Sequence, residues 1–525
     1  MSLSKVNASA ATLTKNRTED SISPSSGMCA TCIDGCIGMC EIGKSAYRGA
    51  EVIYPQPFGM ITTAATKSYP VDLSHFTIQG TVKGAQGIET DSDRMIFPNV
   101  NLERQLGGKG GIRLRLPIVI SALGSTAIAK NNWAGLAVGA AISGIPLTIG
   151  ENVCGMDPKA EFSDGRLVHS PELAERVKMF KDWQRDGYGE IIVQANVEDT
   201  RMGVQEYAIS ELGVTAVEMK WGQGAKDIGG EVRVDSLEKA QLLKSRGYLV
   251  LPDPVSPPII DAFRHRSFRE FERHSRVGVV SEDSFVDRVK NLRKAGAKYV
   301  SLKTGAYRPA DLARALKFSS LAKINVLSAD AAGGGTGMSP WRMMNEWGVP
   351  GVYFWSLLYK YADRLADKGE YVPDIIVGGG LTLEDHIFKA LALGAPYFKA
   401  VGMARAPLAA AMVGKTIGKR LREGQPPVYV GRFGTTPEEV FVTGPELRQR
   451  FKDFEDIPTG AIGVYTYLQR LSQGTRQLMS GSRKFNLDSI ARDDIAALTT
   501  EAAKVSGIKY VMDADKEEVN KILNA

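Results

Sequence analysis

Asp374-Ile-Ile-Val-Gly-Gly-Gly380 and Tyr397-Phe-Lys-Ala-Val-Gly-Met-Ala-Arg405 decide the fold of this chain. Each is a short apolar run that ends in glycine, and the residues between them favour one amphipathic helix. Thr382-Leu-Glu-Asp385 has the spacing of a capping box and predicts where that helix starts. Glycine amides and helix N-termini together bind anions well. We therefore expect a cofactor phosphate at Gly379, Gly380, Gly402, Met403 and Arg405; the alternative is that these glycines only end their strands.

The same alternation of apolar runs and helical segments extends back to residue 117. The expected strands are 117–121, 145–149, 190–194, 214–220, 298–303, 324–328, 373–377 and 397–401. The expected helices are 132–142, 170–183, 237–245, 282–295, 309–318, 340–347, 382–393 and 407–418. About eight βα repeats predict an α/β protein with a (β/α)8 TIM barrel. A long insert at 221–280 interrupts the repeats, and loops of that length tend to be functional.

The chain divides into five regions by composition. They are a flexible polar lead-in at 1–28, a cysteine-rich segment at 29–50, an irregular entrance segment at 51–115, the barrel at 116–415, and a helical extension at 416–525 with helices at 461–478 and 489–503. Hydrophobic content of 43% and charged content of 24% are typical of a globular protein. The net charge of only +6 over 525 residues, without a dense basic run, does not indicate nucleic-acid binding. We expect no membrane span and, without a secretory signal, a cytoplasmic location.

Four of the five cysteines fall within one short window, as Cys29, Cys32, Cys36 and Cys40. In a cytoplasmic chain such a cluster points to metal binding more than to disulfides. Thiolates at these spacings can converge on an iron–sulfur cluster, of the 4Fe-4S type in preference to 3Fe-4S. Structural zinc and unligated thiols are the alternatives. The remaining cysteine, Cys154, is expected to be a buried small residue.

Polar groups gather at the predicted strand ends, where the active site of a barrel lies. They include Ser121 and Ala122, Gly150, Gln194, Lys220-Trp-Gly-Gln223-Gly-Ala-Lys226, Lys303, and Asp330 followed by Gly334 and Gly335. A flavin ring needs a lysine near N1 and O2, an amide side chain at its pyrimidine edge, and close backbone at N5. Lys303 and Gln194 supply the first two, so we infer that the cofactor is FMN.

With these residues the chain resembles the FMN-binding synthase domain of glutamate synthase, and more closely the stand-alone, archaeal-type members of that family. The resemblance covers roughly 95–415. It is carried by Ser121-Ala-Leu-Gly124, Gly150-Glu151, Gln194, Lys220, Gln223-Gly-Ala-Lys226, Lys303, Gly334-Gly-Thr-Gly-Met-Ser-Pro340 and both phosphate loops. The pair Gln-Gly-Ala-Lys and Gly-Gly-Thr-Gly is the most specific part.

The resemblance implies reductive amination, in which ammonia condenses with 2-oxoglutarate and the imine takes a hydride from reduced FMN. The implied catalytic residues are Lys220, Gln223, Lys226 and Asp330, with the lysines holding the dicarboxylate. The iron–sulfur cluster would pass electrons to FMN. The related alternative is an N-methylglutamate synthase-like enzyme that uses an amine. An alternative of another class is an electron-transfer subunit of a larger complex.

The sequence departs from the family at three places. The family's His-Asp pair before Gly-Gly-Thr-Gly is Ala332 and Gly333 here, and its cluster cysteines follow the barrel, whereas 406–525 contain none. The chain opens Met1-Ser2, without the cysteine nucleophile of a glutaminase, and no Rossmann fingerprint follows a strand. We therefore expect an electron donor protein, either a ferredoxin or a NAD(P)H-oxidising subunit. A separate glutaminase subunit and an oligomeric assembly are further expectations.

Overall fold

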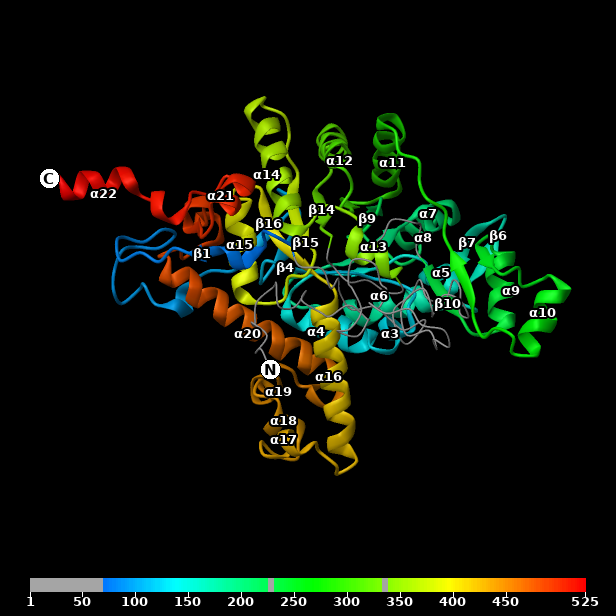
Figure 1. Ribbon diagram of the computed structural model, residues 1–525. Coiled ribbons are helices and arrows are strands. Elements are labelled where there is room, and N and C mark those ends of the chain that lie inside the picture. The colour runs from blue at the N-terminus through cyan, green and yellow to red at the C-terminus, as the bar shows by residue number, and fades with distance from the viewer. Residues whose placement is uncertain (1–68, 225–230, 333–338) are drawn as a thin grey trace, which may run out of the picture.

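The computed structural model describes residues 69–224, 231–332 and 339–525. Eight parallel strands close into a barrel in which each strand pairs with the next in sequence and the last pairs with the first (Figure 1). They are β4 (Ile118–Leu123), β5 (Leu147–Ile149), β8 (Ile191–Ala195), β9 (Ala216–Lys220), β13 (Tyr299–Thr304), β14 (Val326–Asp330), β15 (Asp374–Gly378) and β16 (Phe398–Met403). The predicted TIM barrel is confirmed, and all eight strands overlap their predicted ranges.

A hairpin closes the N-terminal end of the barrel. Its strands, β2 (Arg104–Leu106) and β3 (Ile112–Leu114), lie in the entrance segment, which we expected to be irregular. Leu106, Ile112 and Leu114 join the apolar cluster inside the barrel, whose other members are Val119, Ile192, Ala216, Tyr299, Val326, Ile376 and Ala400. Because this end is filled with apolar side chains, a polar ligand can enter only from the opposite end.

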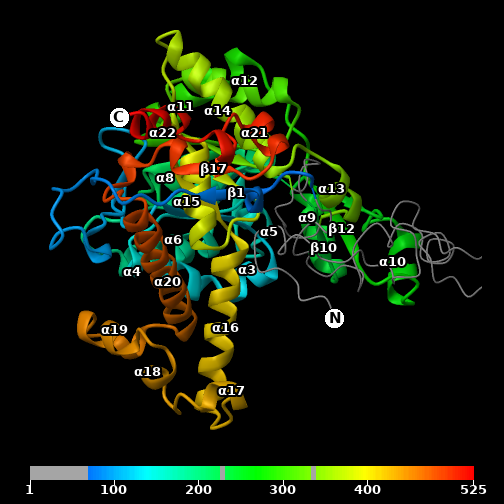
Figure 2. The same cartoon turned by 60° about the vertical axis from the view of Figure 1, so that its left-hand side comes forward.

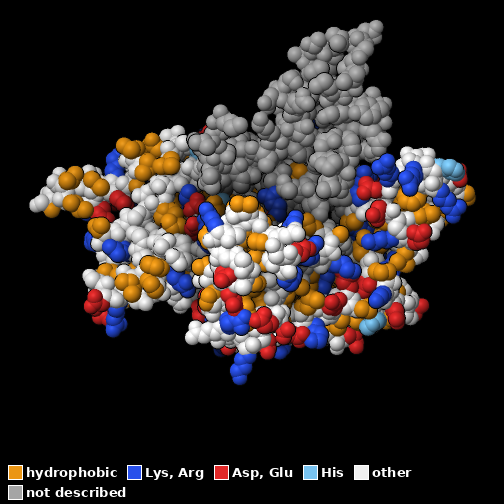
Figure 3. All heavy atoms as spheres, turned by 90° about the horizontal axis from the view of Figure 1, so that it is seen from below, with side chains coloured by type: hydrophobic (Ala, Val, Ile, Leu, Met, Phe, Trp, Pro, Cys, Tyr) orange, Lys and Arg blue, Asp and Glu red, His pale blue; other side chains and the backbone are white. Residues whose placement is uncertain are grey.

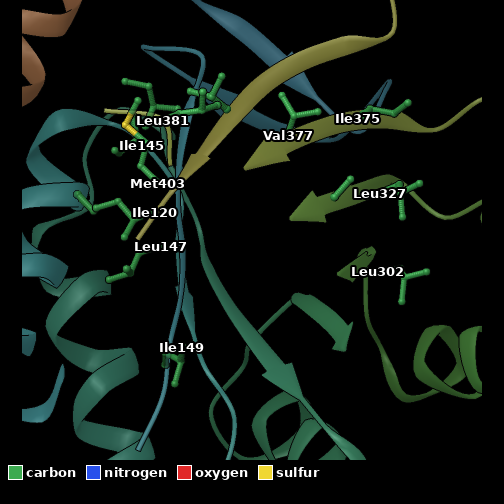
Figure 4. Packing of buried hydrophobic residues seen from close by; sticks show 14 of the residues in the cluster. Ile120, Ile145, Leu147, Ile149, Leu302, Leu327, Ile375, Val377, Leu381 and Met403 are labelled. Carbon is green, nitrogen blue, oxygen red and sulfur yellow. The ribbon is translucent and has the colours of Figure 1, made fainter. Parts of the chain in front are cut away.

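The outer faces of the strands pack against the surrounding helices. Alternate strand residues point away from the barrel axis, as the period of two requires. Figure 4 shows part of the resulting cluster, with labelled residues Ile120, Ile145, Leu147, Ile149, Leu302, Leu327, Ile375, Val377, Leu381 and Met403. Buried aliphatic side chains of this kind supply most of the free energy that holds the barrel together.

The helices follow the predicted order, with the short helices α3 (Ala127–Asn131) and α5 (Val153–Met156) in addition and larger differences after β8 and β14. The predicted ones correspond to α4 (Trp133–Ser143), α6 (Pro171–Trp183), α9 (Leu237–Ser245), α11 (Glu282–Ala295), α12 (Pro309–Leu321), α13 (Trp341–Glu346), α15 (Glu384–Leu393) and α16 (Arg405–Arg422). After β8, two short helices without a predicted counterpart follow, α7 (Val197–Met202) and α8 (Val204–Ser210). After β14, the predicted helix is only the short α13, and a long helix that we did not predict, α14 (Gly351–Asp367), buries Phe354, Trp355 and Leu358.

The insert after β9 contains a small antiparallel sheet of its own. Its strands are β10 (Glu231–Val234), β12 (Phe271–His274) and β11 (Leu249–Leu251), in that order. It also carries α9 and α10 (Pro257–Arg264), which lie at one side of the molecule in Figure 1. Arg273 is fully buried, and its guanidinium lies 5.1 Å from the Tyr248 ring centroid. The insert is therefore an ordered lobe with its own buried contacts.

The C-terminal region folds back along the barrel. Helix α20 (Thr459–Gly481) corresponds to the predicted helix 461–478 and packs against α4, α15 and α16. Between α16 and α20, α17 (Val428–Gly431), α18 (Pro437–Val440) and α19 (Gly444–Arg450) project away from the barrel (Figure 2). The predicted helix 489–503 is wrong. That stretch holds 3-10 turns, β17 (Ile495–Ala497) and the start of α21 (Thr500–Ser506), and β17 pairs antiparallel with β1 (Phe76–Ile78).

The described surface carries a mixture of charges. On the face shown in Figure 3, Lys and Arg side chains are interspersed with Asp and Glu, without one large field of either sign. Over the three described ranges, no helix is both long enough and apolar enough to cross a membrane.

Candidate functional site

Inside the barrel the side chains change from apolar to polar toward the C-terminal end. Because residues two apart point to the same side, the strands that place Ile192, Ala216 and Tyr299 in the lower apolar layer place Gln194, Glu218 and Ser301 directly above it. The same rule puts Ser121, Ser328, Gly378 and Gly402 in this middle layer, and Lys220, Lys303 and Asp330 at the top. Six of the predicted site residues thus meet at the barrel mouth.

Lys303 and Asp330 form a buried ion pair across β13 and β14. The Lys303 Nζ lies 3.4 Å from Asp330 Oδ2, and that oxygen also accepts the Gly224 backbone N–H at 3.3 Å. Burial lowers the pKa of Lys303, but the carboxylates of Asp330, Glu218 and Glu151 together raise it by a larger amount. The pKa of Lys303 is therefore above its usual value. Lys303 therefore remains a cation in the interior of the barrel.

Lys220, at the end of β9, lies between two acceptors. Its Nζ is 2.5 Å from Glu151 Oε1 and 2.7 Å from Gln223 Oε1. Burial raises the pKa of Glu151, but the ammonium groups of Lys220 and, more weakly, Lys303 outweigh it, and the pKa falls to about 2. Glu151 is thus an ionised member of the site. The sequence motif Gly150-Glu151 pointed to this loop, although only Gly150 was predicted as a site residue.

Gln194 and Glu218 form a second polar contact below the lysines. Gln194 Nε2 donates to Glu218 Oε1 at 2.6 Å, and Ser301 Oγ lies 3.4 Å from Glu218 Oε2. Burial raises the pKa of Glu218, while Lys303 and the Gln194 hydrogen bond partly oppose it. The Gln194 Oε1 atom is buried and has no hydrogen-bond partner within the described part of the chain. The sequence did not single out Glu218, because an acid inside a strand carries no motif.

The two glycine loops end neighbouring strands, as predicted. Gly379 and Gly380 have φ of 118° and 96°, which side chains with a Cβ rarely adopt. A Cβ at Gly402 would come within 2.6 Å of Ser121 Oγ, so the glycine allows the Ser121 side chain to lie close to the backbone of β16. Arg405 begins α16, and its Nη1 is buried without a partner among the residues described. Burial lowers the pKa of Arg405, and no neighbouring acid in the described ranges opposes this shift.

The start of α15 differs from the predicted capping box. The helix begins at Glu384, and the expected box between Thr382 and Asp385 does not form. Instead, the backbone N–H groups of Thr382 and Leu383 donate to His386 Nδ1 at 3.0 and 3.2 Å. Burial lowers the pKa of His386, which keeps this ring nitrogen an acceptor. A histidine in the first turn of the helix thus fixes the backbone at Thr382 and Leu383, shortly after Gly380.

Helix α20 contacts both glycine loops through one side chain. The Tyr467 hydroxyl donates to Thr382 O at 2.5 Å and lies 3.8 Å from Met403 Sδ. Burial raises the pKa of Tyr467, so the hydroxyl stays protonated and can donate. The C-terminal region thus contacts both loops of the predicted phosphate site. Sequence reasoning did not reveal this contact.

A cavity of about 560 Å³ lies beside the Lys220 cluster. Its wall includes Lys220, Glu151 and Gln223, together with the aromatic rings of Trp221, Phe285 and Phe318. Trp221 contacts Phe285 edge-on, with ring centroids 5.4 Å apart. The cavity also has four arginines, each in an ion pair: Arg201 and Arg276 with Glu198, Arg288 with Glu206, and Arg314 with Asp311. It can therefore hold a ligand with an apolar part next to the lysine.

Several predicted residues lie outside the described ranges. They are Cys29, Cys32, Cys36 and Cys40, Lys226, Gly334 and Gly335. Among the residues that are described, no group of three or more His, Cys, Asp or Glu side chains is arranged to hold a metal ion. Cys154 is buried, as predicted, and burial raises its thiol pKa, so it is a core residue.

The structural comparisons show distant similarity. The chain is similar to a mutant flavocytochrome b2 with pyruvate bound, at 12% identity and a TM-score of 0.47, covering 85% of this chain and 81% of that one. It is also similar to a mandelate oxidase variant, at 14% identity and a TM-score of 0.42, covering 80% and 85%. A third is the flavin-binding domain of baker's yeast flavocytochrome b2, at 14% identity and a TM-score of 0.44, covering 82% and 78%.

The sequence comparisons point to one family. No curated protein matches the chain. Residues 272–416, from β12 into α16, match the family model described as the conserved region in glutamate synthase. This match supports an FMN-dependent oxidoreductase, and it covers Lys303, Asp330 and both glycine loops. The resemblance of this barrel to the FMN-binding synthase domain of glutamate synthase is thereby confirmed over residues 272–416.

Proposed function

We propose that this chain is an FMN-dependent oxidoreductase of the glutamate synthase type that reductively aminates 2-oxoglutarate or a related 2-oxo acid. One observation carries the proposal. A buried lysine cation and an amide oxygen lie inside the barrel mouth, next to two glycine loops and an arginine nitrogen, and neither the oxygen nor the nitrogen has a partner among the described residues. A flavin phosphate needs the loops and the arginine, and the ring needs the lysine and the amide.

The residues present fit FMN. Arg405 and the amides around Gly379 and Gly380 would hold the phosphate, because anions bind at such loops and helix starts. Gln194 and Lys303 would hold the pyrimidine edge. FMN, when bound, supplies hydride chemistry that no side chain of the chain provides.

The substrate is proposed to bind at Lys220 and Gln223, beside the cavity. Lys220 is held in place by Glu151 and Gln223, so its ammonium is oriented before a carboxylate arrives. Asp330 pairs with Lys303 and accepts the Gly224 backbone N–H, which fixes the backbone at Gly224, two residues before Lys226 in the sequence. Lys226 is proposed as a second cation for the substrate.

We also propose that Cys29, Cys32, Cys36 and Cys40 bind an iron–sulfur cluster, of the 4Fe-4S type, that receives electrons from a ferredoxin or a NAD(P)H-oxidising subunit. The support is the spacing of the four thiols. Metal analysis with an absorbance spectrum of anaerobically purified protein tests it. Iron and sulfide with broad visible absorbance that Cys36→Ser abolishes are expected, whereas zinc would overturn the proposal.

Anaerobic reoxidation tests the reaction. Dithionite-reduced protein should be reoxidised by 2-oxoglutarate plus ammonia, with one glutamate formed per two electrons consumed. Omission of ammonia is the control for oxidation by the oxo acid alone. If no oxo acid reoxidises the protein, it is an electron-transfer subunit.

A second substrate is favoured by Ala332, which stands where the family has a polar residue and is buried. This apolar site admits an N-methylglutamate synthase-like reaction, in which methylamine and glutamate give N-methylglutamate and ammonia. Incubation with both compounds and detection of N-methylglutamate distinguishes it from glutamate synthesis.

A further inference from the structure

We propose that Glu218 is a positioning residue that orients the carboxamide of Gln194, so that its carbonyl oxygen and not its NH2 group faces the cofactor. The proposal rests on the proposed FMN site. It adds a residue that does not itself touch the ligand and that sets which hydrogen-bonding group the barrel presents to it.

The chemistry of the contact determines the orientation of the amide. Gln194 and Glu218 are directly opposite each other on the neighbouring strands β8 and β9, and Gln194 Nε2 lies 2.6 Å from Glu218 Oε1. Donors face both oxygens of Glu218, since Ser301 Oγ lies 3.4 Å from Oε2 and Lys303 lies on the same side, so Oε1 acts as an acceptor and the amide turns its NH2 group toward it. The carbonyl oxygen is then directed away from Glu218, and it is the buried Gln194 atom without a partner in the described ranges.

The two strands are held rigidly at this point from the outer side. Gln205, on α8, is fully buried, and its Nε2 donates to the backbone carbonyls of Glu218 at 3.0 Å and Val193 at 3.4 Å. Arg288 donates in turn to Gln205 Oε1 at 2.8 Å. Because the backbones next to both side chains are fixed, the spacing between the carboxylate and the amide is also fixed. The orientation of Gln194 is therefore set before any ligand binds.

A buried acceptor without a donor is unfavourable until a ligand supplies one. Lys303, on β13, presents a donor on the other side of Glu218, so the barrel offers an acceptor and a donor together. An imide edge, in which an N–H group stands beside carbonyl groups, matches this pair. The isoalloxazine ring has such an edge at N3–H and the adjacent C2 carbonyl. An edge with the opposite pattern would leave the Gln194 oxygen facing another acceptor.

The Glu218→Gln variant tests the orientation directly. A carboxamide at 218 has nearly the same shape but can donate as well as accept, so Gln194 is free to turn over. The probes are FMN and N3-methylated FMN, which lacks the N3–H donor, added to apo-protein. We expect the wild-type protein to prefer FMN by about tenfold or more, and the variant to bind FMN about tenfold more weakly with a preference reduced to about twofold.

Glu190→Gln is the matched control, because it makes the same acid-to-amide change at the opposite end of β8, where the carboxylate accepts the Ile191 amide. It should keep the preference for FMN. A general loss of packing would weaken the binding of both flavins equally, whereas the loss of orientation removes the difference between them. A Glu218→Gln protein that keeps the full preference overturns the proposal.

A second measurement does not depend on the variant's folding. Hydrogen exchange of the N3 proton, followed by NMR of isotopically labelled FMN in the wild-type holoprotein, should be slowed at least tenfold relative to free FMN. Fast exchange would show that Gln194 does not accept from N3 and would overturn the inference while leaving FMN binding intact. A wild-type protein that binds no FMN would overturn both the inference and the proposed function.

Discussion

The Lys220 ammonium lies 2.5 Å from the Glu151 carboxylate, so a cation proposed to bind the substrate is already paired. An acidic substrate must compete with Glu151 for it. Glu151→Gln should therefore lower the KM for 2-oxoglutarate about three- to tenfold, whereas Lys220→Met should raise it about tenfold or more. Steady-state kinetics measures both. Lys130→Met, which breaks the exposed Lys130–Glu172 pair, is the control. An unchanged KM in Glu151→Gln contradicts this arrangement.

The Lys303–Asp330 pair should tune the reduction potential of bound FMN in two directions. Reduction adds negative charge to the ring, so loss of the cation in Lys303→Met should lower the potential, and loss of the neighbouring anion in Asp330→Asn should raise it. We expect shifts of about 30 mV or more, because about 30 mV corresponds to a tenfold change in the two-electron equilibrium. Potentiometric titration of the holoproteins measures them. Shifts of the same sign in both variants would rule out this charge model.

Arg405 should recognise the phosphate specifically. Arg405→Gln removes one charge-assisted contact, worth about 1.5–3 kcal/mol, and should weaken FMN binding roughly tenfold to a hundredfold. Riboflavin, which has no phosphate, should bind both proteins equally. Fluorescence quenching of the two flavins reports their affinities. Arg420→Gln, a change of an exposed residue on the same helix, should alter neither affinity. If Arg405→Gln weakens the binding of both flavins equally, Arg405 does not contact the phosphate.

A side chain at position 402 should be tolerated only if the Ser121 hydroxyl is moved or removed. In Gly402→Ala the new Cβ would meet Ser121 Oγ at 2.6 Å, and overpacking of this kind costs about 1–3 kcal/mol. Urea unfolding should show that loss, and Ser121→Gly in the same chain should recover most of it. The two changes would then be strongly non-additive. Simple addition of their effects would mean that the two residues do not meet.

Asp199 makes stability depend on pH. Burial raises its pKa to about 7, and the amide of Asn152, which donates to Oδ2 at 2.8 Å, only partly offsets this. Because the folded-state pKa is raised, the stabilisation is complete below the unfolded pKa near 4 and is lost as the pH rises through about 7. Asp199→Asn keeps the shape and should be more stable than wild type at pH 8 by on the order of 2–4 kcal/mol.

The difference between wild type and Asp199→Asn should shrink steadily toward pH 4. Urea unfolding across that range measures it. Asp182→Asn, on the exposed side of α6, provides the comparison and should leave the profile of the wild type unchanged. A difference that does not vary with pH would exclude titration of Asp199 as the cause.

The barrel was predictable because each βα unit carries its own local signals. Apolar runs ending in glycine occur at β15 and β16, and amphipathic periodicity is clear in α11 and α12. The error at 489–503 has a physical cause. Ile495–Ala497 becomes a strand because β1, more than four hundred residues earlier, pairs with it, and local periodicity cannot report such a distant partner. Helix α14 was not predicted, and the residues that precede it, Gly348 and Pro350, are of the types that usually interrupt helices.

The site was predictable where residues end strands and unpredictable where residues act on one another. Lys303 and Gln194 follow from strand-end chemistry. Glu218 and Tyr467 do not, because their contacts depend on strand register and on a helix that returns from the far end of the chain. The His386 ring replaces the expected capping box for the same reason, since its competence as an acceptor depends on burial.

The pairing of β1 with β17 sets the order in which the chain can complete its fold. Phe76–Ile78 has no strand partner until Ile495–Ala497 has been synthesised. During translation most barrel strands emerge close in time to their neighbours, whereas the segment that carries β1 must wait until β17 has been synthesised. Contacts of such high sequence separation are slow to form. The pairing of β1 with β17 is therefore expected to form later than the pairing of neighbouring barrel strands.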